Sequence, residues 1–215
     1  MEIVWYGHSC FRFIERGMAA VVTDPFDSDV VGYEPLKLRA DIVTVSHDAP
    51  GHNFIGVVKG ANHRLTGPGE YETGGVFITG VQTDSNNKKG AGRLSNTLFL
   101  FDFDGLTIAH LGDLSQVPSQ SEVEALGTVN VALVPVGGGN GLNASKAAEV
   151  ISLLEPNIVI PMHYAGQSAK LDLDPLSKFL KEMGLTSQET VPSLKITRSG
   201  LPEETKVVIL DIASS

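Results

Sequence analysis

The segment that most constrains this chain is an apolar run, Ile42 to Val45, which ends in a loop with two histidines. A continuous apolar run of this length is typical of a strand covered on both faces, as in an α/β protein. Its carboxyl end then lies at the edge of a sheet, where α/β proteins place their functional groups. His47 and His52 follow it in a turn that contains Pro50 and Gly51. Two imidazoles five positions apart face one point only if the loop folds back, so the pair alone is weak evidence for a metal site.

Composition limits the class of protein. A chain of 215 residues can bury a sizeable core, and we predict a single domain over residues 1–215. The net charge of −9 argues against a nucleic-acid partner. Cys10 is the only cysteine, so no intramolecular disulfide can form. No window reaches about 18 consecutive apolar residues, and we therefore predict a cytoplasmic protein without a signal peptide or a membrane partner.

Strands dominate the first half of the sequence, and strands alternate with helices in the second half. The strands are expected over 3–6, 11–14, 19–23, 42–45, 76–81, 97–103, 106–109, 129–136, 158–160, 194–197 and 207–210. Asp104-Gly105 supplies the positive φ angles of a tight hairpin turn. Ser119 and Glu122 form a capping box before one helix, and Asp174 is expected to cap a later one. The pattern predicts an α/β domain with two sheets covered by helices.

Polar residues with metal-binding side chains stand at or just beyond several predicted strand ends. They are His47, His52, His110, Asp113 and His163. A metal site needs ligands from separate segments, so this convergence favours one. His110 alternates with two apolar residues on one strand face, and we interpret it as a hydrogen-bonded residue that orients the ligands rather than as a ligand. His8, in the turn after the first strand, is interpreted in the same way.

Several short segments, taken in order, resemble the metallo-β-lactamase superfamily, specifically its small metal-dependent hydrolase branch. These segments are Trp5-Tyr-Gly-His-Ser, Thr23-Asp-Pro, Ser46-His47 with His52-Asn53, Gly67-Pro-Gly-Glu-Tyr-Glu, His110-Leu-Gly-Asp113-Leu, Val134-Pro-Val-Gly-Gly and Ile160-Pro-Met-His163-Tyr. They span nearly the whole chain. The resemblance implies an α/β fold built as a four-layer αββα sandwich, with a metal centre at one edge of the two sheets.

The chain departs from the family's His-x-His-x-Asp-His loop at two positions. Ala49 stands where the second His is expected and Gly51 where the Asp is expected, and a further His is missing at Ser85. In the family pattern one metal is held by residues 47, 49 and 85, the other by residues 51, 52 and 163, and Asp113 bridges them. The resemblance therefore leaves His47 and Asp113 at the first position, and His52, Asp113 and His163 at the second.

These losses limit the expected chemistry. A catalytic zinc generally needs three protein ligands and a water, so we expect at most one ion, Zn or alternatively Mn, at the second position. Gly51 cannot activate water as the family's Asp would. Asp48 or Asp113 would then have to act as the base, and hydrolysis of an ester, lactone, amide or phosphoester would be slow.

A second interpretation remains open. With three ligands missing, the chain could be an inactive relative without a metal that binds a small ligand or a protein partner on the same scaffold. Members of this fold often self-associate, so a homo-oligomer is among the expected assemblies. The metal content of the purified protein distinguishes the two interpretations.

Overall fold

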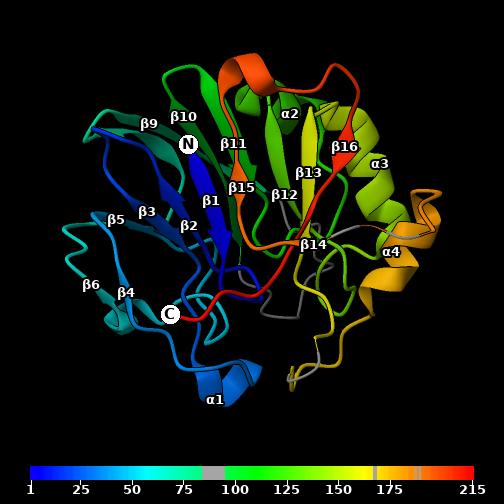
Figure 1. Ribbon diagram of the computed structural model, residues 1–215, viewed down its shortest axis with the longest axis horizontal. Coiled ribbons are helices and arrows are strands. Elements are labelled where there is room, and N and C mark those ends of the chain that lie inside the picture. The colour runs from blue at the N-terminus through cyan, green and yellow to red at the C-terminus, as the bar shows by residue number, and fades with distance from the viewer. Residues whose placement is uncertain (84–94, 167–168, 187, 189) are drawn as a thin grey trace.

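The computed structural model describes residues 1–83, 95–166, 169–186, 188 and 190–215, which form two packed sheets with helices outside them (Figure 1). The first sheet has the order β15 (Leu194–Lys195), β1 (Glu2–Trp5), β2 (Phe11–Ile14), β3 (Val21–Thr23), β5 (Ile42–Thr44) and β7 (His63–Leu65). The second has the order β16 (Lys206–Val207), β13 (Ile158–Met162), β12 (Val131–Pro135), β11 (Leu106–His110), β10 (Asn96–Phe103), β9 (Val76–Thr83) and β8 (Gly69–Thr73).

The remaining elements are short or lie outside the sheets. Two small pairs join β14 (Thr190–Val191) to β17 (Ile209–Leu210) and β4 (Leu38–Arg39) to β6 (Val58–Lys59). The helices are α1 (Ser28–Val31), α2 (Gln120–Leu126), α3 (Ala144–Leu154) and α4 (Leu176–Glu182), with 3-10 turns η1 (Ile55–Val57) and η2 (Arg198–Gly200). In the part of the chain that the structure describes, no helix is long and apolar enough to cross a membrane.

Aromatic side chains join the two sheets. Phe13 of the first sheet packs against Phe101 of the second, with ring centroids 5.1 Å apart and the rings edge to face. This geometry is favourable for aromatic pairs, and both rings are fully buried. The outer face of the second sheet is covered by α3, whose apolar stripe is buried, and by α4 beside it (Figure 1). The outer face of the first sheet packs under α1 and the β4–β6 pair. The predicted αββα sandwich is confirmed.

Local signals in the sequence have different outcomes. Asp104 and Gly105 adopt φ angles of 54° and 81°, as the tight hairpin between β10 and β11 requires. The capping box of Ser119 and Glu122 opens α2 as predicted. The prediction for Asp174 is wrong: Pro175 is the N-cap of α4 and no side chain caps it, while Asp174 pairs with Lys178 at 2.5 Å.

Parallel strand pairs determine where the loops meet. β3 pairs with β5 in the first sheet, and β11, β12 and β13 run parallel in the second. The carboxyl ends of parallel strands share one edge of a sheet, where α/β proteins place ligands. The predicted site residues follow these strands, so both sheets deliver them to one end of the sandwich.

Candidate metal centre

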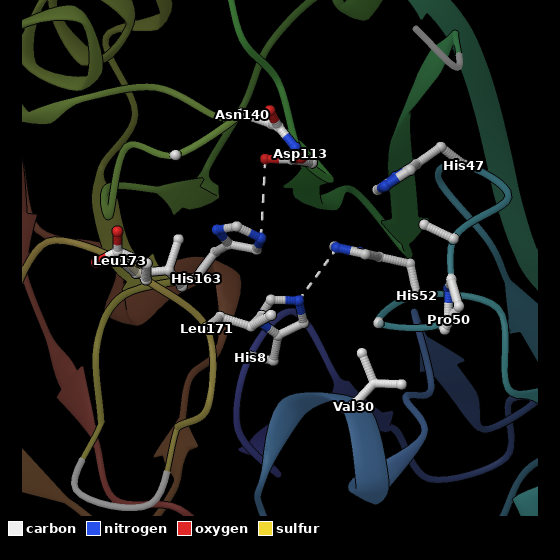
Figure 2. A pocket seen from close by; sticks show the side chains of 14 residues that line it. His8, Val30, His47, Pro50, His52, Asp113, Asn140, His163, Leu171 and Leu173 are labelled. Atoms are coloured by element: carbon white, nitrogen blue, oxygen red, sulfur yellow. Dashed lines mark hydrogen bonds and ion pairs between the residues drawn. The ribbon is translucent and has the colours of Figure 1, made fainter. Parts of the chain in front are cut away.

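A pocket of about 350 Å³ lies at this end of the sandwich (Figure 2). His8 reaches it from the turn between β1 and β2, His47 and His52 from the loop after β5, Asp113 from the loop after β11, and His163 from the end of β13. The side chains point inward from both sheets, so residues that are distant in the sequence share one wall.

Three buried imidazoles form the centre of this wall. We call His8, His52 and His163 the imidazole cluster, because a ligand atom from each lies within 4.8 Å of the other two. Nε2 of His8 is 3.2 Å from Nε2 of His52 (Figure 2), and the rings of His8 and His163 have centroids 4.2 Å apart. Two nitrogens on a tetrahedral zinc lie about 3.3 Å apart, given Zn–N bonds of about 2.0–2.1 Å. The nitrogens of His8 and His52 therefore have the spacing of two ligands of one zinc ion, and the third nitrogen lies within 4.8 Å of both.

The other two predicted ligands lie beside the cluster rather than in it. The ring of His47 is half-buried, with its centroid 4.1 Å from that of His52. Oδ1 of Asp113 is 3.8 Å from Nε2 of His163 (Figure 2). Both residues line the pocket. Coordination by His47 and by Asp113 stays a prediction, whereas His8, predicted to support the site from outside, lies in the pocket itself.

A buried carboxylate that the sequence interpretation missed holds the orientation of His52. Asp24 accepts a hydrogen bond from Nδ1 of His52 at 2.8 Å, and the backbone N–H and hydroxyl of Ser46 donate to it at 2.7 and 2.5 Å. Burial alone would raise the pKa of Asp24, but nearby His110 and the hydrogen bonds from His52 and Ser46 lower it to about 2. An ionised carboxylate can only accept, so Nδ1 of His52 is the donor in this bond and Nε2 is the ring nitrogen that faces the cluster.

The sequence carried a signal for Asp24. It stands directly after β3, in Thr23-Asp24-Pro25, at the same sheet edge as the histidine loop after β5. A carboxylate at a parallel strand end next to a histidine loop is the expected partner of a ligand's second nitrogen.

Burial favours the neutral form of His8, His47 and His163. Loss of solvent and the neighbouring His52 lower the pKa of His163 to about 3, and the same two causes lower the pKa of His47 to about 4. Burial, and next the neighbouring His163, hold the pKa of His8 well below its ordinary range. Neutral imidazole is the form that binds metal, so these rings need no deprotonation near neutral pH.

Backbone strain concentrates at the same place. Five non-glycine residues of the described chain have positive φ, and three of them surround the pocket: His8 at 51°, Asp24 at 38° and His163 at 53°. Such conformations cost about 1–3 kcal/mol each and cluster at functional sites. The fold therefore aims these side chains at the cost of local backbone energy.

The loop after β11 holds Asp113 where it passes close to two other segments of the chain, at Ser46 and Asn96. Gly112 has φ of 58°, and a Cβ there would lie 2.3 Å from Oδ1 of Asn96 and 2.5 Å from Cβ of Ser46. That Asn96 oxygen accepts the backbone N–H of Asp113 at 3.0 Å. Only glycine fits this position, and the turn directs the carboxylate of Asp113 toward the pocket.

His110 lies behind the pocket. Its ring is fully buried, with Nε2 2.9 Å from the carbonyl oxygen of Ser9 and Nδ1 accepting the backbone N–H of Gly112. Its ring nitrogens thus contact the turn that carries His8 and the turn that carries Asp113. This placement connects the two turns to each other.

The positions where the chain departs from the family pattern are partly visible. Ala49 and Gly51 line the pocket, while Ser85 lies outside the described residues. Asp48 is exposed and accepts a hydrogen bond from the side chain of Asn53. It is not among the residues that line the pocket, and its role as a base stays a prediction.

Comparison with known proteins assigns the class. Residues 2–163 match the family model of the β-lactamase superfamily domain, so the chain belongs to this superfamily, as its metallo-β-lactamase motifs predicted. Within it, the chain belongs with the UPF0173 metal-dependent hydrolases. One from Pyrococcus abyssi is 39% identical over 196 residues, covering 76% of this chain and 84% of the relative. Another, from Thermoplasma acidophilum, is 28% identical over 190 residues, covering 76% and 83%.

A solved structure agrees with this assignment. A Thermotoga maritima protein, assigned as a Zn-dependent hydrolase of the metallo-β-lactamase superfamily, is 36% identical with a TM-score of 0.79. The match covers 97% of each chain, so the whole sandwich is shared.

Proposed function

We propose that this chain is a metal-dependent hydrolase that works with a single ion, preferably zinc, held at the imidazole cluster. The observation that carries the proposal is the convergence of three buried imidazole nitrogens within 4.8 Å of one another. The hydrogen bond from His52 to ionised Asp24 supports it, because this partner pattern is common behind metal-bound histidines.

A bound zinc would polarise a substrate carbonyl and lower the pKa of a water. The remaining chemistry falls to the chain's own residues. Asp113 lines the pocket next to His163, and its carboxylate can take the proton of the attacking water. The water oxygen then bonds to the carbonyl carbon, the ester or amide bond breaks, and Asp113 returns the proton to the leaving oxygen or nitrogen. Gly51 has no carboxylate to activate the attacking water, and for this reason we expect slow turnover.

The pocket favours an uncharged substrate. Val30, Leu171 and Leu173 form an apolar wall, and no Lys or Arg occurs among the described residues that line the pocket. Its acidic side chains are Asp113 and Asp172. Two carboxylates offset one divalent ion, so the described residues of the pocket supply no surplus positive charge for a phosphate. A small neutral ester, lactone or amide with an apolar group is therefore the preferred substrate class over a phosphoester.

Metal content tests the proposal. Protein purified with zinc or manganese present is expected to hold close to one ion per chain, measured by inductively coupled plasma mass spectrometry. His163→Asn should lose this ion, because one of three ligands disappears while asparagine still tolerates the positive φ at this position. His63→Ala is the matched control, since His63 is exposed on β7. Metal at background in the native chain would instead support a binding protein without catalysis.

Substrate charge provides an independent prediction. Neutral aryl esters and lactones should be hydrolysed with kcat/KM at least about tenfold above that for aryl phosphodiesters of similar size, because about 1.4 kcal/mol of repulsion gives a tenfold effect. Asp172→Asn should lower the ratio of kcat/KM for neutral esters to kcat/KM for phosphodiesters. Asp172 is exposed at the pocket, and removing its charge lowers the electrostatic repulsion of an anionic substrate. Equal or higher rates on phosphodiesters would contradict the assigned substrate class.

A further inference from the structure

A second cavity lies beside the pocket of the metal centre, at the glycine-rich loop 137–143. We call it the polar chamber, and its volume of about 430 Å³ is within the range of small-molecule sites, about 300–1,000 Å³. Gly139 and Asn140 line both cavities, so the chamber adjoins the pocket. Among the described residues that line the chamber, every side chain carries a hydrogen-bonding group: Ser115, Gln116, Asn140, Asn143, Lys146 and Asp174.

The glycine-rich loop is packed directly against the metal centre. The carbonyl oxygen of Gly137 accepts the backbone N–H of Asp174 at 2.7 Å. A Cβ built on Gly137 would collide with the carbonyl oxygen of His163, and one built on Gly141 would collide with Oδ1 of Asp113. Because these positions lack side chains, the loop approaches both site residues closely. Asp113, the base of the proposed reaction, therefore lies at the boundary between the pocket and the polar chamber.

The charged groups of the polar chamber already have partners. The ammonium group of Lys146 donates to the side-chain oxygen of Gln116 at 3.2 Å and to the carbonyl oxygen of Ser115 at 3.4 Å. The carboxylate of Asp174 pairs with Lys178 at 2.5 Å. One cationic and one anionic side chain line the chamber, so its described residues supply no surplus charge for an ionic ligand.

The remaining groups of the polar chamber suit hydroxyl groups. Three glycines before a helix can indicate a phosphate loop, but the N-terminus of α3 is already capped, because Oδ1 of Asn143 accepts the backbone N–H of Lys146 at 3.0 Å. The chamber instead offers side-chain amides and a hydroxyl, which both donate and accept hydrogen bonds. The hydroxyl groups of a sugar or another polyol do the same, so a neutral polyol matches this lining.

The apolar and polar surfaces lie on opposite sides of the pocket. Figure 2 shows Asn140 and Asp113 together at one side, and Val30 and Leu171 at the other. An ester whose carbonyl lies at the imidazole cluster would place an apolar acyl group against Val30 and Leu171 and its alcohol toward the polar chamber. Asp113 is then on the side of the alcohol, where it can protonate the leaving oxygen.

We propose that the polar chamber binds the alcohol part of the substrate, which is an ester of a neutral polyhydroxylated alcohol, such as a sugar, with an apolar acyl group. The oxygen of water bonds to the carbonyl carbon, the C–O bond to the alcohol breaks, and one proton of the water passes through Asp113 to the alcohol oxygen. The products are a carboxylic acid and the free polyol. This inference rests on the proposed hydrolase and adds the identity of its leaving group.

The experiment compares two butanoate esters in the zinc-loaded protein, the monobutanoate of glucose and hexyl butanoate. They share the acyl group and differ in the hydroxyl groups of the alcohol. We expect kcat/KM at least about tenfold higher for the glucose ester, because several hydrogen bonds to the chamber are made only with the sugar. Gln116→Leu should lower the ratio of the two kcat/KM values by about threefold to tenfold, since leucine is of similar size but forms no hydrogen bond. Gln120→Leu is the matched control, because Gln120 is exposed on α2 and is not among the residues that line either cavity.

Binding provides a readout that needs neither metal nor turnover. Saturation-transfer NMR of glucose monobutanoate with the metal-free native protein should show transfer to the protons of the sugar ring. This transfer should weaken in Gln116→Leu and persist in Gln120→Leu. Thermal unfolding of each variant verifies that it is folded.

A kcat/KM for hexyl butanoate equal to or above that for the glucose ester, or no transfer to the sugar ring, would overturn the inference. If hexyl butanoate is still hydrolysed in that case, and His163→Asn abolishes its hydrolysis, the proposed hydrolase stands and only the polar chamber fails. If neither ester is hydrolysed while binding of the sugar still depends on Gln116, the chamber is supported as a polyol site and the proposed hydrolase fails.

Discussion

Asp24→Asn is expected to weaken zinc binding by about 10–100-fold and to lower the free energy of unfolding by about 1–3 kcal/mol. The carboxylate accepts three hydrogen bonds, one from Nδ1 of His52 and two from Ser46. The asparagine side chain has one acceptor oxygen and one donor NH2 group, so one side of the former carboxylate becomes a hydrogen-bond donor. If that donor faces His52, the ring must shift its proton to Nε2, where it blocks metal binding. If the donor faces the backbone N–H of Ser46 instead, a buried donor pair is left unsatisfied.

Asp41→Asn is the matched control for this change. Asp41 also accepts a backbone hydrogen bond, from Ala20 at 2.9 Å, but it is exposed and far from the pocket. Zinc affinity, measured by chelator competition, and the free energy of unfolding, measured by chemical denaturation, should both be lower in Asp24→Asn than in Asp41→Asn. Native-like zinc affinity in folded Asp24→Asn would show that the orientation of His52 does not depend on this carboxylate.

Metal-free protein should lose stability steeply as the pH falls below about 6.5. In the unfolded chain each histidine takes up a proton near pH 6.5. In the folded chain burial lowers the pKa of His163 to about 3 and of His47 to about 4, and the pKa of His8 is lowered as well. The unfolded state thus binds more protons below pH 6.5, so stability is full above this pH and declines toward pH 4. Each group contributes about 1.4 kcal/mol per pH unit, less for half-buried His47.

Denaturation by urea between pH 7.5 and 4.5 measures this dependence. His163→Asn should reduce the slope by about 1.4 kcal/mol per pH unit, because one shifted group is removed. His63→Ala serves as the histidine control, and zinc-loaded native protein should be more stable throughout the range in which the ion stays bound. A metal-free native protein with equal stability at pH 7 and pH 5 would contradict the low pKa values of His8, His47 and His163.

Features of the fold encoded within a few neighbouring residues were predictable from the sequence. The hairpin at Asp104-Gly105 and the capping box of Ser119 and Glu122 form as expected, since each satisfies its own backbone groups locally. The segment 207–210 was predicted as one strand, but it splits between β16 and β17, which pair with different partners. Such a division depends on which distant strand lies alongside, and no local pattern records that.

The site was predictable in its location but not in its detail. Strand ends and the family motifs predicted that His52 and His163 lie together, and both lie in the pocket. The presence of His8 in the pocket depends on how the β1–β2 turn packs against the loop after β5, which no local pattern records. The role of Asp24 likewise depends on β3 and β5 being parallel neighbours, because only then does the carboxylate face the histidine loop.

The origin of the three imidazoles has a mechanical consequence. His8 and His52 extend from the first sheet and His163 from the second, so a shared ion would fasten the two halves of the sandwich at one end. In a chain whose lone cysteine rules out a disulfide, coordination would be the strongest cross-link between residues 155 positions apart. Hydrogen exchange should then slow on metal loading at the rim of the pocket, and remain unchanged at the opposite end around the Asp104-Gly105 turn.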